Sequence, residues 1–204
     1  MLGSGTAHWT AMNVRRPLAM ALAAAAVVLL AACTGKNAVD QSGGQFRFVS
    51  GTGLGKTYPP SERKKAGGFT GNLLDGTGDV TLAQDAGRVV VINFWATWCG
   101  PCTTETPQLD AMYRANKTKS VQFVGIDTKD NRDSAKAFVK DNDISFPIVF
   151  DEQGETALRL GKIPALGLPF TVLIDKQQRV AAVYLARLTA KDLQPVLDKL
   201  LAES

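Results

Sequence analysis

The sequence contains very little histidine, since His8 is the only one among 204 residues. His8 precedes a basic pair, Arg15-Arg16, and an apolar run over residues 18–30, and this order is typical of a signal peptide. We therefore expect residues 1–32 to be removed, which leaves a mature chain without histidine. Such a chain has no Ser-His-Asp triad, no Cys-His protease site and no histidine-bound metal, and we expect it to need no metal and no cofactor.

The chain also carries little net charge. Lys and Arg number 23 and Asp and Glu number 19, for a net charge of +4. Arg15 and Arg16 are the only charged residues before residue 33, so the mature chain keeps a charge of about +2. This value is too small to indicate a nucleic-acid partner, although it is compatible with a surface near anionic lipid.

Cysteine is scarce as well, with three residues in the chain. Cys33 follows Leu30-Ala-Ala, and this string resembles the lipobox of bacterial lipoproteins. The resemblance implies cleavage before Cys33 and a diacylglycerol thioether on its sulfur. The alternative is a transmembrane anchor, but its apolar core over residues 17–32 is slightly short for a span of about 20 residues. Both interpretations place the remainder outside the cytoplasmic membrane, and lipidation of Cys33 leaves Cys99 and Cys102 to pair with each other.

The residues on either side of the cleavage site predict no folded domain. A well-proportioned signal peptide begins at Met12, so we expect translation to start there. Residues 33–67 are rich in Gly, Ser, Lys and Pro and predict a flexible, lipid-anchored tether with one short strand over residues 46–49. Residues 50–57 nearly match a phosphate-binding P-loop, but serine replaces its first glycine and two prolines prevent the helix that such a loop needs.

We expect one folded domain over residues 68–204, in which strands alternate with helices before a final hairpin and helix. This order predicts an α/β fold with a mixed β-sheet flanked by helices. Apolar β-branched runs predict the strands, and helical spacing of apolar residues predicts the helices. We expect an N-terminal β-hairpin over 69–74 and 79–82, and later strands over 89–95, 121–126, 146–150, 170–174 and 180–184. Helices are expected after Cys99, over 135–141, over 155–160 and over 193–201. Pro195 predicts that the last helix begins late, with a cap at Asp192.

The most informative stretch is Cys99-Gly-Pro-Cys102, which follows the buried-strand pattern of residues 89–95. The two thiols lie one helical turn apart at a strand-to-helix junction. Free N–H groups and the helix dipole stabilise an anion at a helix N-terminus, and a thiolate is the reactive form of cysteine. A bare Cys-x-x-Cys is also compatible with half a zinc site or a structural disulfide. The preceding strand and its tryptophans favour redox chemistry.

Together with its flanks, Phe94-Trp-Ala-Thr-Trp-Cys-Gly-Pro-Cys102 resembles the thioredoxin superfamily, and more narrowly its extracytoplasmic TlpA/ResA branch. The resemblance covers residues 68–202 and implies a thioredoxin fold with thiol–disulfide oxidoreductase activity. It also implies a central αβ insertion between Ile126 and Phe150.

The resemblance implies a role for each residue of the motif. Cys99 is the nucleophile that forms a mixed disulfide with a partner, and Cys102 resolves it. Gly100 and Pro101 shape the turn and, together with Trp98, contact the substrate.

Three further residues outside the motif are expected to serve the site. Pro169 matches the cis-proline of the superfamily and, with Leu168, presents backbone to the partner; Pro164 is a weaker candidate. Glu105 matches a glutamate of the ResA-like branch that exchanges a proton with the resolving sulfur, although most helix glutamates are merely solvated. Asn93 stands where thioredoxins have a buried aspartate, and it cannot titrate.

The resemblance to ResA implies a reductant of the Cys-x-x-Cys-His disulfide of apocytochrome c, supplied with electrons by a membrane thiol carrier of the CcdA or DsbD type. The alternative within the class is a dithiol oxidant that forms disulfides in exported proteins. A thiol peroxidase is disfavoured because Thr97 lies two residues before Cys99 instead of three. A Sco-like copper chaperone is disfavoured by the cysteine spacing and the absent histidine. We expect the protein on the extracytoplasmic face of the membrane.

Overall fold

The computed structural model describes residues 55–161, 163 and 167–203. Among these residues, no helix is long and apolar enough to cross a membrane. The predicted signal peptide, Cys33, the strand over residues 46–49 and Pro164 lie outside the described residues.

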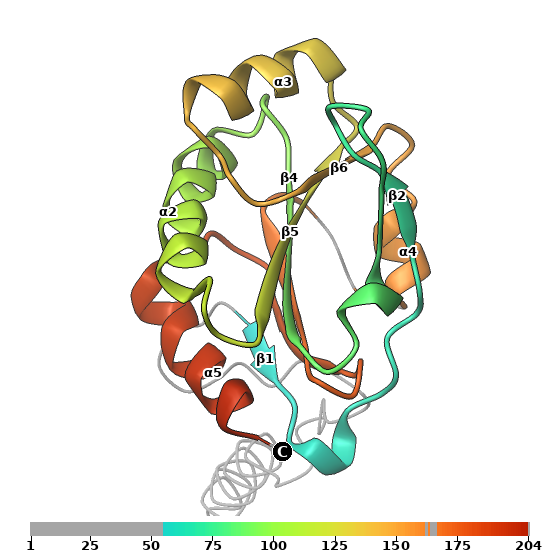
Figure 1. Ribbon diagram of the computed structural model, residues 1–204, viewed down its shortest axis with the longest axis vertical. Coiled ribbons are helices and arrows are strands. Elements are labelled where there is room, and N and C mark those ends of the chain that lie inside the picture. The colour runs from blue at the N-terminus through green and yellow to red at the C-terminus, as the bar shows by residue number, and fades with distance from the viewer. Residues whose placement is uncertain (1–54, 162, 164–166, 204) are drawn as a thin grey trace, which may run out of the picture. The chain divides into compact units, whose positions relative to one another are not determined.

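A six-stranded mixed sheet forms the centre of the described domain (Figure 1), in the order β1-β8-β7-β4-β5-β6. Strands β4, β5 and β6 run parallel to one another, while β7 is antiparallel to β4, β8 to β7, and β1 to β8. The expected α/β class with a mixed sheet is therefore confirmed. The strands are β1 (Gly55–Thr57), β4 (Val89–Trp95), β5 (Val121–Thr128), β6 (Ile148–Asp151), β7 (Phe170–Ile174) and β8 (Val180–Tyr184).

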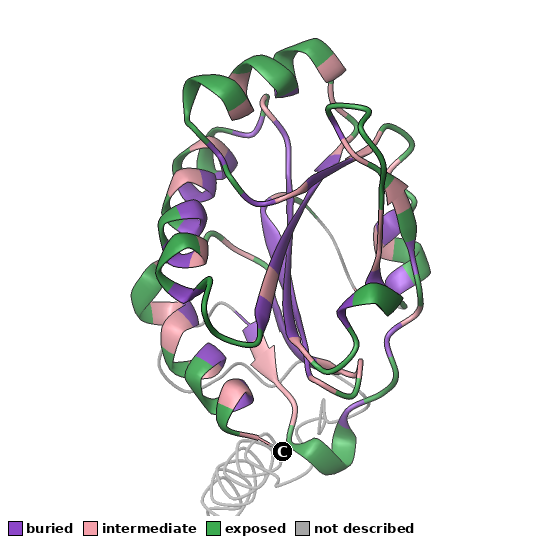
Figure 2. Ribbon diagram, in the orientation of Figure 1, coloured by how far each residue is buried: buried purple, intermediate pink, exposed green. Residues whose placement is uncertain are grey.

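Helices cover both faces of this sheet. Helices α2 (Gly100–Asn116), α3 (Arg132–Asp141) and α5 (Ala190–Ala202) contribute to one apolar core cluster, through residues such as Leu109, Ala135 and Leu197. The other face is covered by α4 (Thr156–Leu160), the 3₁₀ helix Leu82–Asp85 and the expected hairpin of β2 (Thr70–Asn72) and β3 (Asp79–Thr81). Figure 2 shows the buried residues concentrated in the strands, with exposed residues on the outer helix faces.

The folded part of the chain begins earlier than the predicted start at Gly68. Strand β1 pairs with β8, and Ala66 is buried in the core. A side chain at Gly55 would come within 2.3 Å of the carbonyl oxygen of Val183, so this close pairing requires glycine. The sequence did not predict the strand because backbone pairing at a sheet edge, and not an apolar pattern, holds it. No helix follows Lys56-Thr57 directly, in agreement with the rejection of a P-loop.

The start of α5 also differs from the prediction. The helix begins at Ala190, so the expectation that Pro195 delays it is wrong. The Asp192 carboxylate accepts hydrogen bonds from the backbone N–H and the hydroxyl of Thr189, at 2.9 and 2.7 Å, and closes a capping box with Thr189 as the N-cap. This cap starts the helix before Pro195, and Pro195 lies inside it.

A buried ion cluster fastens the N-terminal segment to the end of the domain. The Arg63 guanidinium contacts Asp175 at 3.2 Å, and it also donates to both carboxylate oxygens of Glu203, next to the C-terminal helix. The side chains of Arg63 and Asp175 are only 2% and 1% exposed. Arg179 donates to Asp175 as well, at 2.8 Å.

We expect Arg63→Met to lower the free energy of unfolding by about 3 kcal/mol, because removing this partner leaves the buried carboxylate of Asp175 under-compensated. Arg159→Met is the matched control: its exposed pair with Glu155 is worth less than about 1 kcal/mol. Urea denaturation of the full chain measures both. Equal losses in the two variants would contradict a special role for Arg63.

Candidate active site

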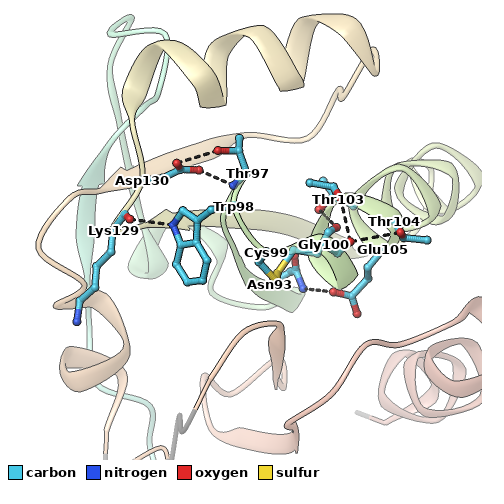
Figure 3. Close-up of a disulfide and its surroundings, with 12 residues drawn as sticks. Asn93, Thr97, Trp98, Cys99, Gly100, Thr103, Thr104, Glu105, Lys129 and Asp130 are labelled. Atoms are coloured by element: carbon cyan, nitrogen blue, oxygen red, sulfur yellow. Dashed lines mark hydrogen bonds between the residues drawn. A yellow bond between two sulfur atoms is a disulfide. The ribbon is translucent and has the colours of Figure 1, made fainter.

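Cys99 and Cys102 form a disulfide at the start of α2 (Figure 3), with their sulfurs 1.97 Å apart. Cys99 is the N-cap residue, and Gly100 and Pro101 form the first helical positions, where a missing N–H costs no hydrogen bond. Cys99 is 6% exposed, whereas Cys102 is 0% exposed. The more accessible sulfur is therefore the one at the helix tip, where the dipole stabilises a thiolate.

Trp98 lies directly before this pair and is exposed to 63%, the largest exposed aromatic surface of the described residues. Its indole N–H donates to the carbonyl oxygen of Lys129, at 3.0 Å (Figure 3). Thr97 donates its backbone N–H and its hydroxyl to Asp130, at 2.5 and 2.8 Å. The loop after β5 therefore holds the segment that leads into Cys99.

The peptide bond between Leu168 and Pro169 is cis. Pro169 is buried and Leu168 is half-buried. Phe170 follows at the start of β7 and pairs with Phe94 of β4, and the two rings stack with their centroids 4.1 Å apart. This antiparallel register places Leu168-Pro169 beside the end of β4, from which the chain continues to Cys99.

Glu105 is fully buried, so the alternative of a solvated helix glutamate is excluded. Its carboxylate accepts a hydrogen bond from the backbone N–H of Leu188 at 2.5 Å and one from the Asn93 amide at 3.0 Å. Asn93 also donates to the hydroxyl of Thr171, at 3.0 Å. Burial raises the pKa of Glu105 to about 6, against the lowering effect of these two donors and of the Arg187 charge. A carboxyl with such a pKa can accept and return a proton near neutral pH.

A second buried carboxyl is that of Asp127, to which the sequence analysis assigns no role at the site; the same is true of Asp151, the last residue of β6. Asp151 does cap α4, by accepting the N–H groups of Glu155 and Thr156 at 3.0 Å. Asp127 instead lies inside β5 and is fully buried. The signal in the sequence is an aspartate that directly continues an apolar strand, but its burial depends on what covers that face of the sheet.

The part of the chain that the structure describes contains no cluster of three or more His, Cys, Asp or Glu side chains arranged to hold a metal ion. The site itself consists of the Cys99–Cys102 pair and, three residues further along α2, the buried carboxyl of Glu105. A redox-active Cys-x-x-Cys pair at the N-terminus of a helix that follows the central strand of a mixed sheet defines the class of thiol–disulfide oxidoreductases with a thioredoxin fold.

Comparison with known proteins agrees with this class. The chain belongs to the AhpC/TSA family, which matches residues 63–183. It is 34% identical over 137 residues to the thiol-disulfide oxidoreductase ResA of Bacillus thuringiensis subsp. konkukian, a match that covers 67% of this chain and 77% of that protein.

Two solved structures from Corynebacterium are similar as well. A DsbF homologue from Corynebacterium diphtheriae is 36% identical with a TM-score of 0.69, covering 76% of this chain and 98% of that one. A secreted thiol-disulfide isomerase from Corynebacterium glutamicum is 33% identical with a TM-score of 0.70, covering 78% and 98%. The predicted fold and enzyme class are thus confirmed.

Proposed function

We propose that this protein is a lipid-anchored reductant on the extracytoplasmic face of the membrane, and that it reduces the Cys-x-x-Cys-His disulfide of apocytochrome c. The similarity to ResA supports the substrate class, and the lipobox-like string that ends at Cys33 supports the anchor. The observation on which the proposal chiefly rests is Glu105, a buried carboxyl one helical turn beyond Cys102 whose pKa is raised by burial to about 6.

The proposed reaction moves two electrons from the protein to its partner. The Cys99 thiolate attacks one sulfur of the partner disulfide, which forms a mixed disulfide and releases the other partner sulfur as a thiolate. Cys102 then loses its proton to Glu105 and attacks the sulfur of Cys99. The partner leaves as a dithiol, and the Cys99–Cys102 disulfide remains. A membrane thiol carrier of the CcdA or DsbD type returns the pair to the reduced form, because an oxidising compartment does not.

The surface around Cys99 supports binding of an extended partner segment. Trp98 offers an exposed apolar face, with Gly100 and Pro101 exposed beside it. The backbone at Leu168-Pro169, next to the end of β4, offers hydrogen bonds to an added strand. In this arrangement the backbone contacts bind the partner, and Trp98 packs against the residues that flank its disulfide.

A second candidate, a dithiol oxidant or isomerase of exported proteins, is favoured by the similarity to the secreted isomerase of Corynebacterium glutamicum. The reaction is the same in reverse, so the reduction potential of the Cys99–Cys102 pair distinguishes the two: a value near that of DsbA would favour the oxidant. A peroxidase is less compatible with the site, because the Thr97 hydroxyl donates to Asp130. The Cys-x-x-Cys spacing likewise disfavours a Sco-like copper chaperone.

Trapping of the partner tests the proposal. With Cys102→Ala in the full chain, Cys99 cannot be released from its partner, and we expect mixed disulfides with cytochrome c apoproteins or their assembly factors. Mass spectrometry after non-reducing electrophoresis identifies them, and Cys99→Ala with Cys102 intact is the control that should trap far less. If most of the trapped partners were unrelated exported proteins, the result would contradict the reductant assignment and favour the oxidant.

A further inference from the structure

The carboxylate of Asp130 holds the segment that precedes Cys99, and it does so only as a hydrogen-bond acceptor. Asp130 receives the N–H and the hydroxyl of Thr97, and also the N–H of Asn131 at 2.7 Å. Burial acts to raise the pKa of Asp130, but these donors outweigh it and hold the pKa below its usual value. Asp130 is therefore the ionised member of any pair that it forms with another carboxyl.

The second carboxyl group of this region is that of Asp127 in β5. In the β4–β5 register Asp127 lies opposite Trp95, so its side chain is on the sheet face that α2 and α3 cover. Neither of its oxygens has a hydrogen-bond partner among the described residues. The Asp130 carboxylate, which binds Thr97 two residues after Trp95, is the acidic group that acts on it most strongly. Two ionised carboxylates in contact repel each other, whereas a protonated Asp127 can donate its O–H to Asp130 and leave neither group unsatisfied.

We propose that Asp127 and Asp130 share one proton, and that this acid–carboxylate pair is a positioning device that holds Thr97 and Trp98 in place in front of Cys99. Asp127 acts through Asp130, and Asp130 acts through the two hydrogen bonds from Thr97. Trp98 is fixed by the same loop, through the carbonyl of Lys129. Loss of the shared proton places two negative charges side by side and weakens the contact of Asp130 with Thr97.

The charged groups that face Asp127 favour its neutral form. Burial is the main cause that raises the pKa of Asp127, to about 8, followed by the charge and hydrogen bond of Asp130 and the charge of Asp151 on β6. Arg132 of α3 acts in the opposite direction, but it donates to the carbonyl of Leu74 and lies over the ring of Phe150 at 4.2 Å. Lys129, on the same loop, is exposed.

The sign of the pH dependence follows from the raised pKa. In the released state, the segment around Thr97 has moved away and Asp127 is exposed to water, where its carboxyl ionises at its ordinary pKa. In the held state its pKa is about 8. Between these two pKa values the held state therefore binds one more proton than the released state. The hold on Thr97 is therefore strongest at low pH and weakens as the pH rises towards 8. Above that pH it changes no further.

Hydrogen exchange of the Thr97 amide in the full chain, corrected for the intrinsic rate, measures this hold. In the wild type we expect its protection factor to fall between pH 6.5 and 8, by up to about tenfold per pH unit, and to level off above that range. In Asp127→Asn a neutral amide donates to Asp130 at every pH, so the protection factor should stay flat. Asp133→Asn, which removes an exposed carboxylate of α3, should retain the wild-type slope.

A flat wild-type profile would overturn the proposal, and so would the same slope in Asp127→Asn as in the wild type. Infrared difference spectroscopy of the wild type provides a second measurement if the asparagine variant does not fold. The carbonyl stretch of a protonated carboxylic acid should disappear with a midpoint near pH 8, well separated from the titration of Glu105 near pH 6. Its absence at pH 7 would equally contradict a shared proton.

Discussion

Replacement of Cys99 by serine is expected to reduce disulfide exchange with a protein substrate to the rate of the uncatalysed reaction. A hydroxyl is not a nucleophile towards sulfur at neutral pH, and the other thiol of the pair, Cys102, is fully buried. The loss should be the whole of the catalytic effect, as it nearly is when a nucleophile is removed from other enzymes. Reduction of a fluorogenic disulfide peptide by the chemically reduced full chain measures the rate.

Cys102→Ser is the matched control for this prediction. It retains the thiolate at the helix tip, so we expect a fast first step that consumes about one equivalent of substrate and then stops as a mixed disulfide. The two serine variants should thus differ in the first step and agree in having no turnover. Comparable first-step rates in the two variants would show that the assignment of Cys99 as the nucleophile is wrong.

Replacement of Glu105 by glutamine is expected to slow turnover by about 10²-fold, the effect of losing one general base. In the wild type the resolving step should slow as the pH falls through about 6, because a protonated Glu105 cannot accept the proton of Cys102. The glutamine variant should show no such inflection. Single-turnover release of the partner between pH 5 and 8 separates this step from the initial attack.

The same substitution should stabilise the fold at neutral pH. The pKa of Glu105 is raised from 4.5 to about 6, so its contribution to stability is full below pH 4.5 and is lost as the pH rises through 6. Removing the ionisation should therefore raise the free energy of unfolding at pH 7 by about 2 kcal/mol. The Oδ1 atom of Asn93, which has no hydrogen-bond partner in the described part of the chain, is available to accept from the new amide.

Glu155→Gln changes an exposed glutamate in the same way and should alter neither the pH profile nor the stability by more than about 0.5 kcal/mol. A glutamine variant at position 105 that loses both activity and stability would contradict the role of Glu105 as a proton acceptor, since it would then be a structural residue. Unchanged turnover would contradict it as well.

Local patterns in the sequence were sufficient for much of the fold. The apolar run before Cys99 predicts a buried strand, the Cys-Gly-Pro-Cys string predicts a helix start, and the order of strands and helices predicts a mixed sheet. These features depend on the residues within one or two turns of each position, so they can be recognised without knowledge of the packing. The reactive pair itself is of this kind, because its two cysteines are three residues apart.

Tertiary structure alone decided the environment of the carboxyl groups. Glu105 is desolvated by segments that include Leu188, 83 residues away in the chain, and Asp127 is buried on the sheet face that α2 and α3 cover. The docking of Arg63 on Asp175 and Glu203, 112 and 140 residues away, likewise placed the start of the domain before Gly68. The pKa of a carboxyl group depends on how far distant segments exclude water from it and which charges they place near it. The sequence by itself therefore determined which cysteines form the reactive pair, whereas the fold determined which carboxyl groups hold their protons.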